Sequence, residues 1–280
     1  MSDAFNERLR AAQRRTGSLL CVGLDVDPTR LPHELSQDHH GFRHFVRGIV
    51  DATADLVSAY KPNLAFYEAM GEHSYGLLRD TLDAIPAGLI TIADAKRGDI
   101  GTTAERYASA IFETLGFDAM TVNPYQGSDS VEPYVRDREH GAFVLCKTSN
   151  PGSDDFQNVR SAADERPLWE LVAQRALTWN AGNNVGLVVG ATFPEQLARV
   201  RTLAPELPIL IPGVGTQGGD AAESARLGAA ADGTMAVVNV SRQVLYASAG
   251  ADWRDAARSE ATALRDAMRA AAGASPAGRP

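Results

Sequence analysis

Short apolar runs recur along the chain, and a longer stretch with helical periodicity separates most neighbouring runs. The eight runs lie at residues 18–25, 59–66, 89–96, 119–125, 142–149, 185–192, 208–215 and 234–241. Amphipathic patterns predict helices between them at residues 42–57, 102–115, 168–180, 195–203 and 219–227, and after them at about 253–271.

This alternation indicates an α/β protein with a parallel sheet and right-handed crossovers. Eight such units close naturally into a single (β/α)8 TIM barrel, and 280 residues is a common length for one. A doubly wound open sheet is the alternative. Residues 3–15 predict an extra N-terminal helix that covers the bottom of the barrel. We expect the barrel domain to span residues 1–272 and the tail, 273–280, to be disordered.

Two insertions interrupt the alternation of predicted strands and helices. They lie at residues 28–41, after the first strand, and at 150–167, after the fifth. Both follow the carboxyl end of a strand, which is the face on which barrels build active sites. They are therefore candidate walls or lids of a site, and tolerated surface insertions are the alternative.

Composition excludes several classes of protein. Hydrophobic residues make up 44% and charged residues 22% of the chain, as in ordinary globular proteins. Lys and Arg number 27 against 35 Asp and Glu, and the net charge of −8 gives no general attraction to nucleic acid or to an anionic membrane. An anionic ligand must then be held by local groups.

The sequence contains no sign of secretion or of a membrane span. No stretch approaches the roughly 18 apolar residues that cross a bilayer, and the first ten residues lack the apolar core of a signal peptide. Cys21 and Cys146 both lie inside apolar runs, where a buried thiol is the usual interpretation. We expect a cytoplasmic protein.

Polar and charged residues gather where the predicted strands end. They are Asp25, Lys61, Asp94, Lys96, Asn123, Lys147, Ser149 and Arg242. Asp94 and Lys96 are two residues apart, so on a strand they share a face, about 7 Å from each other, and enter the mouth of the barrel. A structural set of ion pairs is the alternative, although buried ion pairs stabilise a fold only weakly.

Carboxylates around a lysine determine its protonation state and therefore the reactions in which it can take part. The neighbouring negative charges favour the ammonium form, so the lysine can donate a proton but is a poor Schiff-base nucleophile. A carboxylate in the same row repels an anionic substrate group beside it. Such a row suits a reaction that loses a negative group and then takes up a proton.

The glycine pattern at Gly213, Gly215 and Gly218 indicates a phosphate site rather than a dinucleotide site. It follows the seventh strand, where barrels often bind phosphate, and no acidic strand end lies about 20 residues further on. Gln217 and Arg242 supply donors suited to phosphate oxygens, so the pattern predicts a phosphorylated small molecule.

A metal site is not indicated. Three histidines lie close together in the sequence, in a polar loop and a helix start, without a matched carboxylate, and they are interpreted as solvated residues. They are His39, His40 and His44.

The segment DAKRGDIGTT at residues 94–103 resembles the Asp-x-Lys-x-x-Asp-Ile-x-x-Thr pattern of the orotidine 5′-phosphate decarboxylase family. Further matching segments follow in family order across nearly the whole barrel. They are GLD at 23–25, YKPN at 60–63, KTSNPG at 147–152, PGVGTQGGD at 212–220 and SR at 241–242. The length, the VNPY segment at 122–125 and the long loop after strand five are similar to the bacterial type 2 subgroup.

The resemblance implies decarboxylation of orotidine 5′-phosphate to UMP in pyrimidine synthesis, without cofactor or metal. It implies a homodimer with shared active sites, in which Asp99 of one subunit completes the other subunit's row of Lys61, Asp94 and Lys96. Lys96 would be the proton donor, and Asp94 would lie beside the leaving carboxylate. The implied substrate contacts are Asp25 and Thr103 for the ribose, Ser149 for the pyrimidine, and Pro212, Gln217, Ser241 and Arg242 for the phosphate side. Ser241 departs from the glycine that many members have before the arginine.

Two other functions remain as alternatives. One is a Mg²⁺-dependent decarboxylase of the same superfamily that acts on a keto-gulonate phosphate. Lys61 argues against it, because a metal site favours an acidic residue at that place. The other is a non-catalytic nucleotide-binding barrel, which the intact Lys96 and Asp99 disfavour.

Overall fold

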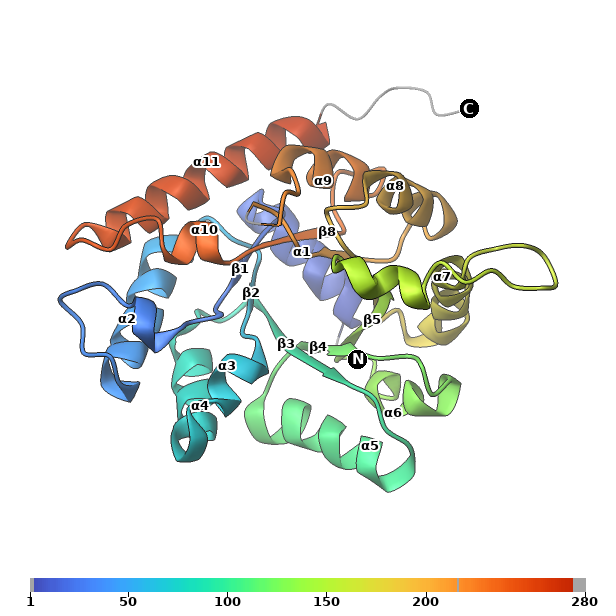
Figure 1. Ribbon diagram of the computed structural model, residues 1–280, viewed down its shortest axis with the longest axis horizontal. Coiled ribbons are helices and arrows are strands. Elements are labelled where there is room, and N and C mark those ends of the chain that lie inside the picture. The colour runs from blue at the N-terminus through green and yellow to red at the C-terminus, as the bar shows by residue number, and fades with distance from the viewer. Residues whose placement is uncertain (1–2, 216, 274–280) are drawn as a thin grey trace.

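A computed structural model describes residues 3–215 and 217–273, and its eight parallel strands close into a barrel in chain order (Figure 1). The strands are β1 (Leu20–Gly23), β2 (Ala59–Lys61), β3 (Ile90–Arg97), β4 (Ala119–Val122), β5 (Gly141–Lys147), β6 (Val185–Val189), β7 (Ile209–Ile211) and β8 (Ala236–Val240). β1 pairs with both β2 and β8, which closes the sheet. The predicted (β/α)8 barrel is confirmed, and the open sheet is excluded.

Helices surround the barrel and connect its strands (Figure 1). They are α1 (Phe5–Thr16), α2 (His39–Thr53), α3 (Leu64–Glu68), α4 (Ser74–Ala84), α5 (Gly101–Ala108), α6 (Glu132–Val135), α7 (Leu168–Trp179), α8 (Pro194–Leu203), α9 (Ala221–Gly228), α10 (Arg242–Leu245) and α11 (Trp253–Gly273). A π-helical segment, Ser109–Leu115, continues α5. Gly273 belongs to α11, and the rest of the predicted tail lies outside the described residues. No helix within the described ranges has the length and apolarity that a membrane span requires.

The strand predicted at 59–66 is too long. β2 ends at Lys61, because Pro62 has no N–H to donate to a neighbouring strand. The Asn63 side chain then accepts a hydrogen bond from the backbone N–H of Ala65 and begins α3. The apolar residues of α3 therefore belong to a helix that follows the strand.

Period-two alternation divides the apolar residues of the strands between two layers. On β7, Leu210 faces the interior of the barrel, whereas Ile209 and Ile211 pack toward the surrounding helices. On β8, Val237 faces inward and Val238 outward. The interior is thus a packed core, and the polar strand ends lie above it.

The extra N-terminal helix, α1, covers the bottom of the barrel as predicted. Phe5 and Leu9 of α1 are fully buried and belong to the same apolar cluster as the inward residues of the strands. The Phe5 ring meets Phe143 of β5 edge to face, with 5.8 Å between centroids. Gln13 hydrogen-bonds the backbone on either side of the start of β8, which fixes the helix to the sheet.

We predict that Phe5→Ala lowers the free energy of unfolding by about 3–5 kcal/mol, because it opens a cavity beneath the barrel core. Denaturant unfolding of the variant and the wild type measures this. Tyr75→Ala is the control, since that side chain is 61% exposed and its loss should change stability by no more than about 0.5 kcal/mol. Equal effects for the two variants would show that α1 does not contribute to the core.

Candidate active site

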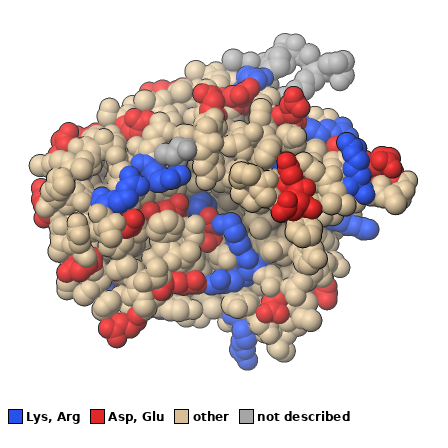
Figure 2. All heavy atoms as spheres, viewed as in Figure 1, with Lys and Arg blue, Asp and Glu red and all other residues tan. Residues whose placement is uncertain are grey.

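A cavity of about 400 Å³ opens at the carboxyl ends of the strands. Space-filling shows a hollow near the middle of this face, with acidic and basic side chains next to one another (Figure 2). Nine of the eleven predicted site residues line the cavity, namely Asp25, Lys61, Asp94, Lys96, Ser149, Pro212, Gln217, Ser241 and Arg242. The structure therefore brings together residues from distant parts of the sequence.

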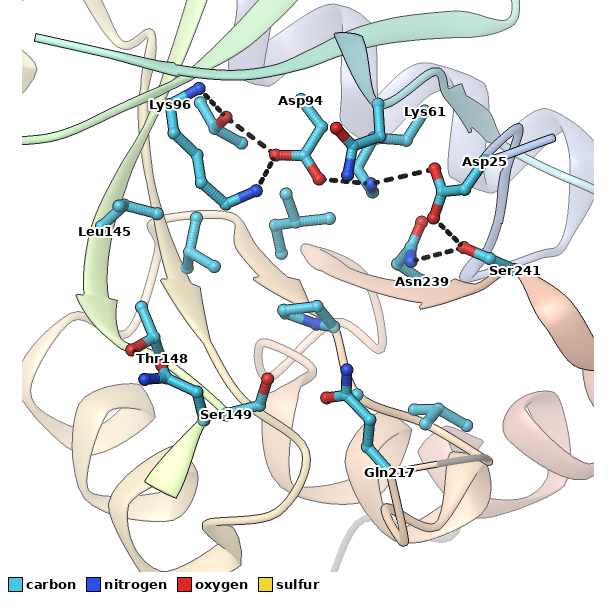
Figure 3. A pocket seen from close by; sticks show the side chains of 18 of the residues that line it. Asp25, Lys61, Asp94, Lys96, Leu145, Thr148, Ser149, Gln217, Asn239 and Ser241 are labelled. Carbon is cyan, nitrogen blue, oxygen red and sulfur yellow. Dashed lines mark hydrogen bonds and ion pairs between the residues drawn. The ribbon is translucent and has the colours of Figure 1, made fainter. Parts of the chain in front are cut away.

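Asp94 lies between two ammonium groups. Its Oδ2 is 2.6 Å from Nζ of Lys61, and its Oδ1 is 2.5 Å from Nζ of Lys96. Lys61 is 3% exposed, whereas the side chain of Lys96 is 49% exposed and faces the open cavity. On its other side, Lys61 Nζ lies 4.0 Å from Oδ1 of Asp25, so the charges alternate along a row (Figure 3).

The end of β3 leaves regular pairing to present this row. The register with β4 shifts between Ala93 and Arg97, and such irregularities re-aim side chains. Lys96 has a φ of 47°, in the left-handed region that non-glycine residues rarely adopt. The Thr121 hydroxyl accepts a hydrogen bond from the Lys96 backbone N–H at 2.8 Å and donates one to Asp94 Oδ1 at 3.1 Å. Thr121 thus binds both the backbone of Lys96 and the carboxylate of Asp94.

Asp25 is fixed from the β8 side. The Ser241 hydroxyl donates to Asp25 Oδ2 at 2.8 Å, and the Asn239 amide donates to Ser241 Oγ at 3.4 Å. Asp25 Oδ1 accepts no hydrogen bond from the described residues. That oxygen is buried and faces the ammonium group of Lys61.

The charge row shifts the pKa values of its buried members. Burial by itself lowers the pKa of Lys61, but the carboxylates of Asp94 and Asp25 outweigh it, so the pKa of Lys61 is raised. Burial by itself raises the pKa of Asp94, yet Lys61 and Lys96 hold it well below its usual range. At neutral pH the pair is therefore ionised.

The glycine-rich segment after β7 forms another part of the wall. Gly213, Gly215 and Gly218 have φ values of 94°, 75° and 93°, which residues with a Cβ avoid. Gln217 lies across the cavity from the charge row, as does Ser149 at the end of β5 (Figure 3). Arg242, at the start of α10, lines the cavity, and its guanidinium group forms no hydrogen bond or ion pair with the described residues.

Asp99 and Thr103 do not line the cavity of their own chain. Asp99 follows β3, and Thr103 lies in α5. Between them Ile100 is 52% exposed, and Tyr125 in the neighbouring loop after β4 is 81% exposed. Ile100, next to Asp99 in the chain, and Tyr125 are therefore two large apolar side chains that the single chain leaves exposed.

The two insertions differ in their relation to the cavity. Asn150, the first residue of the second insertion, lines the cavity, so the beginning of this insertion forms part of the wall. None of the described residues 28–41 does so, and Glu34 instead accepts a hydrogen bond from Trp253 of α11. The first insertion is therefore a surface insertion that packs against the C-terminal helix.

Sequence reasoning missed several residues of the cavity wall. They include Asn63, Thr121, Thr148 and Asn239. Thr121 is a β-branched residue inside a strand, where threonine is common for its backbone preference alone, so the pattern carried no signal. Asn239 interrupts the apolar run of β8 and is 7% exposed, and a polar residue inside such a run is a signal.

The histidines form no metal site. The His39 ring stacks against His73 and meets His40 at a tilt, with 4.0 Å between ring centroids in each pair. His44 lies 2.7 Å from a guanidinium nitrogen of Arg254. Across residues 3–215 and 217–273, no three His, Cys, Asp or Glu side chains are grouped so that they could hold a metal ion.

Comparison with known proteins gives consistent matches over most of the chain. Residues 18–258 match the model of the orotidine 5′-phosphate decarboxylase / HUMPS family. An orotidine 5′-phosphate decarboxylase of Roseiflexus castenholzii is 53% identical over 268 residues, covering 95% of this chain and 98% of the relative. One of Herpetosiphon aurantiacus is 49% identical over 264 residues, covering 93% and 96%. The solved structure of Leishmania donovani OMP decarboxylase is similar with a TM-score of 0.82 and 41% identity, covering 95% of this chain and 99% of that one.

The chain contains three lysines, so lysine-selective ¹³C or ¹⁵N labelling gives three side-chain signals that single substitutions assign. We predict that Lys61 titrates above the ordinary lysine pKa of about 10.4, because Asp94 and Asp25 stabilise its ammonium form. The stability that this adds is present below the ordinary pKa and is lost as pH rises through the raised one.

Asp94→Asn is the matched variant for that titration. It removes the nearest negative charge, so burial, which lowers the pKa, is opposed mainly by Asp25. The Lys61 signal should then titrate at lower pH than in the wild type. A Lys61 pKa at the ordinary value in the wild type, or one unmoved by Asp94→Asn, would contradict the alternating row.

Proposed function

Because this chain belongs to the orotidine 5′-phosphate decarboxylase family, we propose that Lys61, Asp94 and Lys96 are the residues that perform its reaction. The chain is an enzyme that decarboxylates orotidine 5′-phosphate to UMP and carbon dioxide in pyrimidine biosynthesis. The observation that carries the proposal is the position of Asp94, which is ionised and fixed between two ammonium groups at the cavity wall.

The charge row repels the carboxylate of the substrate and stabilises the negative charge that forms when carbon dioxide leaves. Asp94 lies beside the carboxylate of the bound nucleotide, and their repulsion is relieved when carbon dioxide leaves. The carbon–carbon bond breaks, its electron pair stays on the pyrimidine carbon, and the Lys96 ammonium transfers a proton to that carbon. The neutral amine of Lys96 then regains a proton from water. Lys61 and Lys96 stabilise the developing negative charge because they are already in place before the reaction.

Preorganisation of Lys96 depends on its backbone. The left-handed conformation and the hydrogen bond to Thr121 set the direction in which the side chain leaves β3. The side chain is half exposed toward the cavity, where a substrate carbon can meet its Nζ. Fixed donors of this kind need no reorganisation during the reaction.

The remaining lining residues hold the nucleotide. Asp25 accepts a hydrogen bond from a ribose hydroxyl, and Ser149 contacts the pyrimidine. Pro212, Gln217 and Arg242 lie on the phosphate side, where the guanidinium of Arg242 is free to pair with the dianion. The Ser241 hydroxyl is committed to Asp25, so Ser241 serves the phosphate through its backbone N–H.

The proposed reaction needs no cofactor and no metal. Asp94, the innermost carboxylate of the site, is already neutralised by two ammonium groups, and Asp25 faces Lys61. A divalent cation requires carboxylate oxygens that are not engaged in this way. The donor set is therefore poorly suited to the Mg²⁺-dependent alternative.

The active enzyme is proposed to be a homodimer with shared sites. Asp99 and Thr103 lie outside their own cavity, and Ile100 and Tyr125 expose apolar surface beside them. A two-fold interface here would cover that surface and bring Asp99 of each subunit into the other's charge row, and Thr103 to the other's ribose.

We propose the cytoplasm as its location. Cys21 and Cys146 are both free and buried, and burial raises the pKa of each thiol to about 12. Protonated buried thiols suit a reducing compartment, and they are not reactive nucleophiles.

We predict that Lys96→Ala loses at least about 99% of the turnover of orotidine 5′-phosphate, because the proton donor and one positive charge are removed. The fall in absorbance of the nucleotide measures this, and a thermal melt controls for folding. Wild-type activity should be equal with and without EDTA. A variant that keeps a tenth of the activity would refute the role of Lys96, and inhibition by EDTA would support the Mg²⁺-dependent alternative.

The shared site is tested by mixing Lys96→Ala chains with Asp99→Ala chains, each of which should be inactive alone. In a mixed dimer one site carries both changes, while the other has native Lys96 from one chain and native Asp99 from its partner. Random pairing makes half the dimers mixed, so about a quarter of wild-type activity should return. If mass spectrometry verifies the exchange and no activity appears, Asp99 does not act across an interface.

A further inference from the structure

The third lysine of the chain, Lys147, is buried beside the cavity without lining it. The sequence contains 3 lysines and 24 arginines, and two of the lysines belong to the charge row. Lys147 is the last residue of β5 and is 0% exposed. At every other position where the chain has lysine or arginine, the residue is arginine. Position 147 is therefore one at which the chain uses an ammonium group instead of a guanidinium group.

The surroundings of Lys147 fit a compact cation. Its Nζ donates to Ser153 Oγ and to Asp154 Oδ1, each at 2.8 Å. It also lies 4.4 Å from the centroid of the Phe193 ring. Three contacts converge on one nitrogen, whereas the donors of a guanidinium spread over a plane. A buried charge needs such partners, because without them its desolvation is not compensated.

These contacts close a turn that begins at the cavity. Ser153 and Asp154 lie in the 3-10 helix Pro151–Asp155, which folds back over the end of β5. Beside them, the Gln157 side chain accepts from the Thr148 backbone N–H and donates to the Thr148 hydroxyl, both at 2.9 Å. The first three residues of the turn, 148–150, all line the cavity. The wall is thus held from behind by Lys147 and Gln157.

Ser149 has little room to move within this wall. A Cβ placed on Gly190, at the end of β6, would lie 2.8 Å from the Ser149 Cα and Cβ atoms, so glycine permits a close approach there. The Gly190 backbone N–H donates to the Lys147 carbonyl at 2.7 Å. Ser149 faces the charge row across the cavity (Figure 3), and a shift of the turn would move it relative to a bound nucleotide.

We propose that Lys147 is a positioning residue for decarboxylation. Its ammonium group holds Ser153 and Asp154 and thereby fixes Ser149 where the pyrimidine binds. The inference rests on the proposed contact between Ser149 and the pyrimidine. Lys147 touches neither the substrate nor the charge row, and it acts through the turn.

Lys147→Met tests the inference, because methionine keeps the length of the side chain and its packing against Phe193 but removes the charge. We expect kcat/KM for orotidine 5′-phosphate to fall about tenfold or more, mainly through KM, since a contact to the ground state is displaced. Lys147→Arg, which keeps a positive charge, should not restore kcat/KM to the wild-type value. Arg160→Met is the control, since it removes an exposed charge from the same insertion and should leave the kinetics unchanged.

The same substitution in a Ser149→Ala background separates positioning from general damage. If Lys147 acts through Ser149, Lys147→Met should reduce kcat/KM little further once Ser149 is alanine. An equal reduction in both backgrounds, with a lower melting temperature, would show a merely structural role and overturn the inference. Wild-type kinetics for Lys147→Met would also overturn it.

Failure of the proposed contact between Ser149 and the pyrimidine can be distinguished from failure of the inference about Lys147. If Ser149→Ala has wild-type kinetics, the pyrimidine contact is wrong and the inference falls with it. If Ser149→Ala is impaired but Lys147→Met is not, only the inference falls.

If Lys147→Met does not fold, Asp154→Asn and Ser153→Ala test the inference in its place. The Asp154 side chain is 63% exposed, so Asp154→Asn leaves the core intact while weakening the hold on the turn. Asp154→Asn and Ser153→Ala should each raise KM in the same direction as Lys147→Met, by a smaller factor. Unchanged kinetics in both variants would overturn the inference.

Discussion

The carboxylate of Asp94 is the group on which the rest of the site depends. A buried carboxylate is strongly destabilised unless opposite charges and hydrogen bonds surround it, and here Lys61 and Lys96 supply the charges while Thr121 supplies a hydrogen bond. The barrel brings these groups from β2, β3 and β4 to one point. The irregular end of β3 and the left-handed Lys96 are tolerated because the neighbouring strands fix every partner.

The two sides of the cavity are built on different principles. Lys61, Asp94 and Lys96 of the charge row stand on the adjacent strands β2 and β3. Thr121 of β4 holds Asp94, and Ser241, just after β8, holds Asp25. The opposite wall consists of turns after β5 and β7, which depend on glycine conformations and on the buried Lys147. A charged side built on strands thus faces a wall built on turns, and hydrogen bonds hold both sides in place. Donors fixed in this way keep the electrostatics of the site constant while nucleotides enter and leave.

Much of this could be predicted from the sequence because its signals are local. Period-two and helical patterns defined the strands, and the spacing of Asp94 and Lys96 placed both at the mouth. The end of β2 was misjudged because the apolar residues after Pro62 resemble a strand when the proline and the Asn63 cap are overlooked. Lys147 looked equivalent to the other strand-end lysines, since only three-dimensional packing shows that it points behind the wall. Thr121 was missed because threonine is common in strands for its backbone preference alone. Asp99 lies outside the cavity of its own chain, and a role for it in the site rests on the proposed dimer.

The helix beneath the barrel determines the route by which substrate and product enter and leave the site. Phe5 and Leu9 close the lower end, and inward side chains such as Phe143 and Leu210 fill the interior above them. The barrel axis is therefore no conduit, and everything that reaches the charge row passes through the upper opening. Carbon dioxide formed at the charge row, as proposed, must therefore leave through the same opening by which the nucleotide enters.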